Sequence, residues 1–456
     1  NLKKLFIYNL NYFDYLNQKN HNVKSLQKEK IIDWIKNNIN INSTAWEPYP
    51  MSLRIVNWIK WYSFNNNFSS LMLNSLWNQT KFLSKNLEFH LLGNHLLANL
   101  KAIFFSRSIF NDNKVNKIYL KALKIFKYEL NEQFLDDGGH FELSPMYHAI
   151  LIEDLLDLVN ISNDLPKNFP VESIKIKIIN GMEWLYYMTY INGEFSHFND
   201  SVNDIAPDYN LLFDYSKRLN IKLKKPKRNY KYLSKTGYFI IKNSNVHLIA
   251  DVGNVGPDYL PGHAHADTLS FELFLNDTRF IVNSGISTYE NNNIRKQQRS
   301  TSYHNTLEIN DLNSSDVWAS FRVGKRANTS NLFTNVTNDR IEFSCSHNGY
   351  NSCFNKIIHQ RGWVYKKNKI IIIDKIFGEI QKCKSRFYFH PSVKLKRDRK
   401  QIIAYINEKK ICRILTDENN RILKSHYFPS FGIKKSNLCL IIDIKKSGTY
   451  KTVFEF

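Results

Sequence analysis

Residues 261–274 of this 456-residue chain read PGHAHADTLSFELF. Within this stretch His263, His265 and Asp267 occupy alternate positions directly after a glycine. Alternate side chains of an extended backbone lie on one face, so this spacing aims three polar groups in the same direction. The apolar alternation that starts at Leu269 predicts a β-strand behind them.

Two later segments carry related groups at the ends of predicted strands. One strand is predicted at 279–283 and ends on Asn283, and another is predicted at 306–309, shortly after His304. If these strands share a sheet, their polar ends converge with the His-x-His-x-Asp cluster. Such convergence is typical of a divalent-metal site or a histidine-rich catalytic site, and spacing alone leaves both open. The structural alternative is a set of buried, hydrogen-bonded histidines.

Length and composition restrict the class of protein to which this chain can belong. A chain of 456 residues suits two large domains, and its 43% hydrophobic and 14% aromatic content is ample for folded cores. The formal net charge of +22 favours an anionic partner such as a nucleic acid, a membrane surface or an acidic polysaccharide. Because the sequence has no Arg-rich or RNP-type basic stripe, we do not expect a nucleic-acid partner.

The positions of the cysteines and the lengths of the apolar runs narrow the class of protein further. The five cysteines lie in the C-terminal part without a C-x-x-C pair, which indicates neither a zinc ribbon nor a dense disulfide framework. The sequence has no run of about 18 apolar residues, so no transmembrane segment is expected. The N-terminus lacks the apolar region of a signal peptide. If a leader has been removed the protein would be periplasmic or secreted, and otherwise cytoplasmic; the oligomeric state is not predicted.

The first half of the chain has helical periodicity. Apolar residues recur at helical spacing in segments joined by short polar connections, at 51–64, 69–83, 90–105, 114–134, 145–159 and 171–190. A succession of helices of this length predicts stacked antiparallel pairs, arranged as a solenoid or an α/α toroid.

Three places in the helical half carry more than core residues. Trp46 and Arg54 flank a proline-rich loop, where an aromatic face suits a sugar ring; the alternative is a hydrophobic staple. Asn94 and His95 follow a glycine at a predicted helix start, which favours anions; the alternative is an N-cap. Tyr147 follows a Gly-Gly loop at another helix start, where simple packing is the alternative.

The periodicity changes from helical to alternating at about residue 237. A charged, proline-containing stretch at 222–232 precedes the change and is typical of a connector between domains. We therefore place the domains at 1–225 and 226–456. Short strands with polar turns then run to the C-terminus, which predicts an antiparallel β domain of sandwich type.

Several of these segments, taken in chain order, resemble the heparinase II/III-like family of polysaccharide lyases, which includes related alginate and oligoalginate lyases. They are Trp46 to Trp58, Gly93-Asn94-His95, Ser144-Pro145-Met146-Tyr147-His148, Gly262 to Asp267 and Tyr303-His304-Asn305-Thr306. The resemblance covers nearly the whole chain. It implies an incomplete α/α toroid followed by an antiparallel β-sandwich domain, and cleavage of uronic-acid polysaccharides by β-elimination.

The resemblance also implies roles for individual residues. Asn94 and His95 match the groups that neutralise the substrate carboxylate. Tyr147 matches the tyrosine that acts as general acid, and as base in some members, while His263 matches the catalytic histidine of the β domain. Because the family gives His263 and His265 separate tasks, a bend must interrupt the extended backbone between them.

The metal site that the resemblance implies departs from the family at one position. His265 and His304 match two ligands, usually of zinc, whereas the third ligand of the family is an aspartate and this chain has Asn283 there. A neutral amide is a poorer zinc ligand than a carboxylate. Either the metal is absent, weaker or of another kind, or Asp267 supplies the carboxylate.

Substrate contacts are predicted for Trp46, Arg54, Tyr289 and Arg299, each with surface exposure or packing as the alternative. The resulting hypothesis is an enzyme, a lyase of anionic polysaccharides, in which Tyr147 and His263 form the acid–base pair. Two alternatives remain: a metal-dependent glycan hydrolase and a non-catalytic glycan-binding protein.

Overall fold

The computed structural model describes residues 4–18, 24–66, 68–224, 226, 228–276, 278–352, 355–399 and 401–456. The chain forms two compact units. The first, called here the helical unit, comprises Asn1–Phe134, Leu151–Ile178 and Tyr215–Lys222. The second, called the sheet unit, comprises Leu135–Ile150, Ile179–Asp214 and Leu223–Phe456. Residues 225 and 227 of the predicted connector lie outside the described residues.

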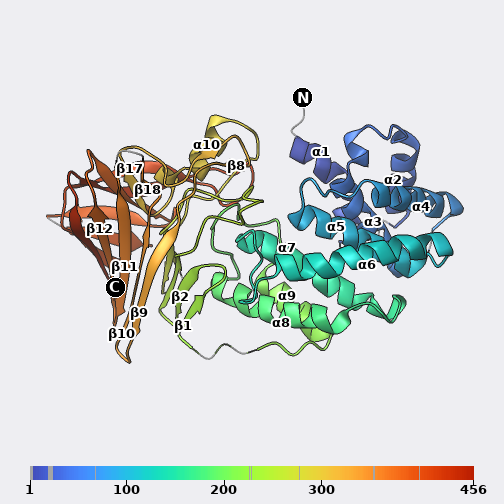
Figure 1. Ribbon diagram of the computed structural model, residues 1–456, viewed down its shortest axis with the longest axis horizontal. Helices are drawn as coiled ribbons and strands as arrows, with labels where there is room; N and C mark the ends of the chain where they lie inside the picture. Colours follow the sequence, from blue (N-terminus) through green and yellow to red (C-terminus); the bar gives the residue numbers. More distant parts are fainter. Residues whose placement is uncertain are drawn as a thin grey trace. The chain divides into compact units, whose positions relative to one another are not determined.

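Helices α1 to α9 precede the first strand, and α3 to α8 among them follow the predicted segments closely (Figure 1). Their bounds are α1 Lys4–Leu10, α2 Lys24–Asn37, α3 Pro48–Asn65, α4 Ser70–Lys85, α5 Gly93–Ile109, α6 Asn113–Gln133, α7 Pro145–Asn160, α8 Val171–Met188 and α9 Tyr209–Arg218. Their starts have local causes. The Asp112 carboxylate accepts the backbone N–H groups of Lys114 and Val115 at the start of α6, and a proline opens α3.

Helix α5 forms the centre of the helical unit. It packs against α3, α4 and α6, and nearly every side chain between Asn94 and Ser106 is buried. A helix that is apolar all round must be surrounded by other helices, which explains this central position. Trp58 and Trp61 of α3 are fully buried core residues in the same unit.

The sheet unit contains two large antiparallel sheets. The first has the order β1-β2-β3-β4-β5-β13-β18-β17, with β6 beside β13, and the second has the order β14-β15-β16-β19-β12-β11-β10-β9. The bounds in the first sheet are β1 Tyr230–Leu233, β2 Tyr238–Lys242, β3 Val246–Asp251, β4 Phe271–Leu275, β5 Thr278–Ile281, β6 Leu307–Ile309, β13 Cys383–Phe389, β17 Asn420–Tyr427 and β18 Lys435–Ile444. Those in the second are β9 Thr329–Val336, β10 Arg340–His347, β11 Ile358–Lys366, β12 Lys369–Phe377, β14 Lys394–Asp398, β15 Gln401–Ile406, β16 Lys409–Thr416 and β19 Gly448–Glu455.

The two sheets face each other across one hydrophobic core, as the predicted sandwich requires. Phe239 of β2 stacks on Phe343 of β10 with 3.9 Å between ring centroids, and Trp363 of β11, the cross-strand partner of Phe343, stacks on it at 4.8 Å. Inward-facing residues of both sheets alternate with outward-facing ones, which produces this core. A two-stranded ribbon, β7 Val317–Trp318 with β8 Arg322–Val323, and the short helix α10 Asn293–Arg299 complete the unit.

The prediction of an extended backbone through the His-x-His-x-Asp cluster is wrong. Residues 261–270 form turns, and β4 begins only at Phe271. Leu269 has a left-handed backbone conformation, with φ of 62°. The bend sends neighbouring polar side chains to different partners, as the family resemblance implied.

None of the helices in the described part of the chain combines the length and apolar character needed to cross a membrane. Cys345, Cys383, Cys412 and Cys439 are buried free thiols, and Cys353 lies outside the described residues. Burial raises the pKa of the Cys345 thiol to about 11, so this thiol is not in its reactive thiolate form at neutral pH.

Candidate functional site

Tyr147 and His263 lie in contact within the sheet unit. Their ring centroids are 4.1 Å apart, and the planes are inclined by 34°. The Tyr147 hydroxyl is also 2.7 Å from the hydroxyl of Tyr289. The side chains of Tyr147, Tyr289 and His263 therefore form one cluster. The His263 side chain is 16% exposed, so it is not completely closed off from solvent.

The segment around residues 199–200 positions the start of α7, where Tyr147 lies. The Ser144 hydroxyl donates to the backbone carbonyl of Asp200 at 2.9 Å, and the Asn199 side-chain amide donates to the carbonyl of Leu143 at 2.9 Å. Ser144 Oγ in turn accepts the backbone N–H of Tyr147. The tyrosine is therefore held through the same loop that supplies Asp200.

The Asp200 carboxylate is the hub of the site and is completely buried. Its Oδ2 lies 2.9 Å from Nδ1 of His263, its Oδ1 lies 2.9 Å from Nε2 of His265, and both oxygens accept from Arg295. Burial raises the pKa of this carboxyl, but the Arg295 charge outweighs that effect and holds it well below the usual value. Asp200 is therefore ionised and only accepts hydrogen bonds.

An ionised Asp200 fixes the tautomers of both imidazoles. His263 must donate from Nδ1, which leaves its Nε2 with a free lone pair, the form that a general base requires. His265 must donate from Nε2, which leaves its Nδ1 with a free lone pair. The Arg295 guanidinium also donates to the backbone carbonyl of Ser320, which holds it in position beside Asp200.

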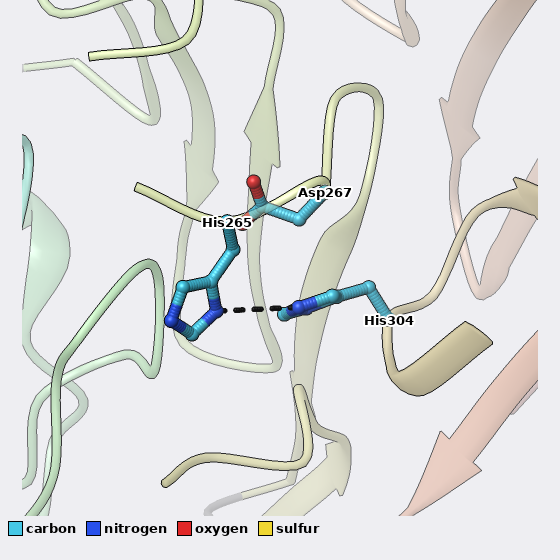
Figure 2. A group of neighbouring side chains, drawn as sticks. All are labelled: His265, Asp267 and His304. Atoms are coloured by element: carbon cyan, nitrogen blue, oxygen red, sulfur yellow. Dashed lines mark hydrogen bonds between the residues drawn. The ribbon is translucent and has the colours of Figure 1, made fainter. Parts of the chain in front are cut away.

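The free nitrogen of His265 points at His304, as Figure 2 shows. Nδ1 of His265 and Nε2 of His304 are 3.3 Å apart, and Asp267 places a carboxylate oxygen within 4.8 Å of both. Two nitrogens bound about 2.0–2.1 Å from one tetrahedral ion would be about 3.3 Å apart. The spacing of the two imidazoles therefore fits a shared metal ion.

The protonation states of the two imidazoles also fit a metal. Burial lowers the pKa of His265 to about 4 and that of His304 well below its usual value, so both rings are neutral at physiological pH. Asp267 Oδ2 is buried without a hydrogen-bond partner among the described residues. Burial raises the pKa of Asp267 to about 7, so this carboxyl has to lose its proton as an ion binds. The ionised carboxylate and the two imidazole lone pairs form a donor set that Zn²⁺ and related ions accept.

The structure brings Asp267, rather than Asn283, to the two histidines. The Asn283 amide oxygen lies 3.3 Å from Nδ1 of His304, which is the ring nitrogen that does not face His265. Because the two nitrogens of one imidazole point in different directions, Asn283 and His265 do not share one ion through His304. Asn283 instead orients the ring from outside the cluster.

The predicted carboxylate-binding pair belongs to the helical unit. Asn94 lies in the first turn of α5 and is 6% exposed. His95 follows it and packs against Tyr49, with 4.3 Å between ring centroids and the planes inclined by 32°, and its Nδ1 is 3.3 Å from the Glu88 carboxylate. The contacts with Tyr49 and Glu88 fix the direction of this imidazole.

The predicted substrate-binding residues have different surroundings. Tyr289 lies in the site beside Tyr147, whereas Trp46 is half-buried and donates to the carbonyl of Asn38 at 2.7 Å. Arg54 is completely buried, stacks on Trp34 at 3.8 Å and donates to Gln79 and to the carbonyl of Ala45.

Arg299 is likewise completely buried, with its guanidinium directed at backbone carbonyls, including that of Ala264 at 2.9 Å. With their donors engaged inside the protein, Arg54 and Arg299 have the surroundings of structural cations. This placement argues against the substrate contacts that we predicted for them.

Sequence reasoning missed Asp200 and Arg295. Asp200 lies in an irregular polar loop, SHFNDS at 196–201, with neither helical nor strand periodicity. Its partner His263 is 63 residues away, and Arg295 is 95 residues away. No local spacing relates such distant positions, so only the folded backbone identifies them.

Two family models match the chain in succession. The heparinase II/III N-terminus matches residues 8–217, and the heparinase II/III-like C-terminal model matches residues 225–453. Together they account for nearly the entire sequence, in the order that the motifs predicted.

Named relatives have related descriptions. The chain is 24% identical over 332 residues to a heparin-sulfate lyase of Bacteroides thetaiotaomicron, covering 62% of this chain and 47% of that protein. It is 23% identical over 380 residues to a heparin-sulfate lyase of Pedobacter heparinus, covering 74% and 52%. The chain thus spans about half the length of the curated relatives it matches.

Solved structures share the fold. A crystal structure of heparinase III superposes with a TM-score of 0.76 at 20% identity, covering 95% of this chain and 74% of that one. A mutant heparan sulfate lyase from Pedobacter heparinus gives a TM-score of 0.69 at 17% identity, covering 99% and 75%. These likenesses confirm the predicted fold class of a helical toroid followed by a β-sandwich. On the strength of both family models, the chain belongs to the heparinase II/III-like family.

Proposed function

We propose that the protein is a polysaccharide lyase that cleaves a uronic-acid-containing anionic polysaccharide by β-elimination. The observation that carries the proposal is the contact between the Tyr147 phenol and the His263 imidazole, with Asp200 holding Nδ1 of that imidazole. The names of the relatives, heparin-sulfate lyases, support a glycosaminoglycan of the heparan type as substrate. The net charge of +22 favours the approach of such a polyanion.

The chemistry explains why these groups are required. The proton next to a uronate carboxylate is barely acidic, because its removal adds a second negative charge. Donors that neutralise the carboxylate lower that barrier, and we assign this task to Asn94 and His95. Nε2 of His263 and the phenol of Tyr147 then remove the C5 proton and protonate the departing O4. Which of the two is the base depends on the uronate epimer.

Tyr289 and Asp200 support this pair from either side. The Tyr289 hydroxyl shares a hydrogen bond with the Tyr147 hydroxyl, which restricts the rotation of the Tyr147 O–H bond. Asp200 restricts His263 to one tautomer. Both contacts place a proton, or a lone pair, at a defined atom before the substrate arrives.

We further propose that His265, Asp267 and His304 hold a zinc ion. Bound there, the ion would supply a positive charge that ties two loops together, one carrying His263 and one carrying His304. The three side chains are 1%, 4% and 1% exposed, which leaves them little access to a substrate. Their burial favours a structural role and weighs against a hydrolase that would activate water at this cluster.

The test is incubation with heparan sulfate, hyaluronan and alginate, followed by ultraviolet absorbance and mass analysis of the products. A lyase yields unsaturated uronate ends that absorb in the ultraviolet, whereas a hydrolase yields saturated ends. Tyr147→Phe and His263→Ala should each lower the rate about 10²–10⁴-fold. Tyr405→Phe, on the half-buried face of β15, is the matched control and should leave the rate unchanged.

Absence of unsaturated product with all three polymers, from protein of normal melting temperature, would contradict the proposal. Binding without cleavage by that same protein would instead favour a non-catalytic glycan-binding function.

A further inference from the structure

A hollow of about 350 Å³ opens on the helical unit between α4 and α6. Its floor is apolar and consists of Trp77, Leu87, Ile103, Ile118 and Ala122. Five lysines surround the floor, and we call this feature the lysine groove: Lys81 and Lys85 from α4, and Lys114, Lys117 and Lys121 from α6.

The spacing of the lysines places them on one face of each helix. On α6 they occur at i, i+3 and i+7, and on α4 at i and i+4. Lys114 and Lys121 are therefore about 10 Å apart along the helix axis. All five side chains are exposed at the rim of the groove.

The segments of α4 and α6 that carry these lysines contain no acidic residue. Helix α4 contains no Asp or Glu, and α6 contains none before Glu129. Among the described residues, no carboxylate forms an ion pair with any of the five lysines. By contrast, Lys60 and Lys101 of the same unit both pair with Asp157.

Like charges at helical neighbours repel each other and weaken the helix. An ordinary soluble surface relieves this repulsion by mixing acidic side chains among the basic ones. The lysine groove lacks that relief while enclosing apolar surface, including a tryptophan with Lys81 Nζ 5.7 Å from its ring centroid. Both features favour a ligand that combines negative charge with an apolar face.

We propose that the lysine groove is a second binding site for the anionic polysaccharide, one that holds the chain away from the sugar being cleaved. The ligand class rests on the proposed function. Carboxylate or sulfate groups would meet the ammonium groups, while the apolar face of a sugar ring would lie on Trp77. Flexible lysine side chains suit a polymer whose charged groups are irregularly spaced.

The lysine groove is separate from the predicted carboxylate-binding pair in the same unit. Its floor residue Ile103 and Asn94 both lie on α5, nine residues apart, which corresponds to about 14 Å along the helix axis. None of the residues lining the groove has been assigned to catalysis or to the metal cluster. Substitutions there can therefore be tested against an intact catalytic site.

The experiment uses the full chain carrying Tyr147→Phe, which should slow cleavage about 10²–10⁴-fold, so that the polymer stays intact while binding is measured. The groove variant adds K85Q/K117Q/K121Q, and the matched control adds K24Q/K30Q/K36Q on α2, three exposed lysines of the same unit. Binding to long heparan sulfate chains is measured at several salt concentrations. The groove variant should bind roughly tenfold more weakly with a shallower salt dependence, and the control should change less than about twofold.

Equal losses in both triple variants would show that only net charge matters and would overturn the proposal, as would unchanged binding in the groove variant. Displacement of heparan sulfate from the groove by an equal concentration of a duplex DNA fragment would also overturn it, in favour of unselective polyanion binding.

A second measurement separates this inference from the proposed function. In otherwise active protein, K85Q/K117Q/K121Q should lower kcat/KM for long chains and leave a tetrasaccharide rate unchanged. If the parent protein yields no unsaturated product from any chain but still binds heparan sulfate through these lysines, the lyase function is wrong and the groove stands. A tetrasaccharide rate that falls as much as the long-chain rate would overturn the groove.

Discussion

Nδ1 of His263 and Oδ2 of Asp200 lie 2.9 Å apart, and this contact connects the proposed acid–base pair to the proposed metal cluster. The other oxygen of the same carboxylate accepts from His265, which faces His304. One buried aspartate thus sets the tautomers of two histidines to which we assign different tasks. The loop at 196–201, which carries Asp200 and was not among the predicted motifs, therefore orients both His263 and His265.

Asp200→Asn should remove most of the proposed activity and destabilise the protein. The neutral amide leaves Arg295 buried without its counter-charge, and losing one partner of a buried ion pair typically costs about 3–5 kcal/mol. Chemical denaturation and the rate of unsaturated-product formation measure the two effects. Asp204→Asn, at an exposed position four residues away, is the control and should be neutral. Asp200→Asn protein with parental stability and rate would refute the role of Asp200 as the hub.

Metal content should depend on Asp267 and not on Asn283. Asp267→Asn removes the carboxylate that lies within 4.8 Å of the facing nitrogens of both histidines, so the bound zinc measured by mass spectrometry should fall well below one ion per chain. Asn283→Asp should leave the stoichiometry unchanged, because residue 283 faces the other nitrogen of His304. Removal of the ion by a chelator should lower the melting temperature of the parent protein. The opposite pattern in the two variants would show that Asn283 is the ligand.

Arg361 should matter for stability although it touches no predicted site residue. Its guanidinium is completely buried, forms two bonds to Asp374 and donates to the backbone carbonyls of Leu269 and Asn305. These carbonyls belong to the two loops that bear the metal cluster. Arg361→Met should cost about 3–5 kcal/mol of unfolding free energy, because Asp374 loses its counter-charge. Arg413→Met, in an exposed pair with Glu455, should cost less than about 1 kcal/mol and serves as the control.

The same ion pair predicts a direction for acid sensitivity. Burial raises the pKa of Asp374, but the Arg361 charge outweighs it and lowers the pKa below the ordinary value of 3.8. A carboxyl whose pKa is depressed by folding contributes stability that is present above its unfolded pKa and lost as the pH falls toward the folded pKa. Unfolding free energy should therefore decline below about pH 4, and Asp374→Asn should flatten that decline. Identical pH profiles for the two proteins would contradict this assignment.

Lys101 should be a key cation of the helical unit. Lys101 lies on α5 and is buried, and its ammonium group is 2.6 Å from a carboxylate oxygen of Asp154 and 2.6 Å from one of Asp157. Although burial raises the pKa of Asp157, the charges of Lys101 and then Lys60 lower it to about 2. Lys101→Met should therefore destabilise the protein by about 3–5 kcal/mol, as measured by urea unfolding. Lys121→Met, exposed on α6, should change the stability by less than about 0.5 kcal/mol.

By itself, the sequence determined the helical half, the strands and the residues of the motifs. The helical spacing around Trp58 and Trp61 and the strand alternation after Leu269 follow from local burial, which repeats every few residues and can be read in one dimension. Gly93-Asn94-His95 and the segment around Tyr147 indicated the family because their residues are adjacent in the chain.

Only the tertiary structure decided which residues meet. It placed Asp267 near the facing nitrogens of His265 and His304 and directed Asn283 at the other nitrogen of His304. It also buried Arg54 and Arg299, and brought Asp200 to His263 across 63 residues. The physical reason is that a bent loop has no period. Where the backbone turns at each residue, as between 261 and 270, the direction of a side chain depends on distant partners that hold the loop and not on its position in the sequence.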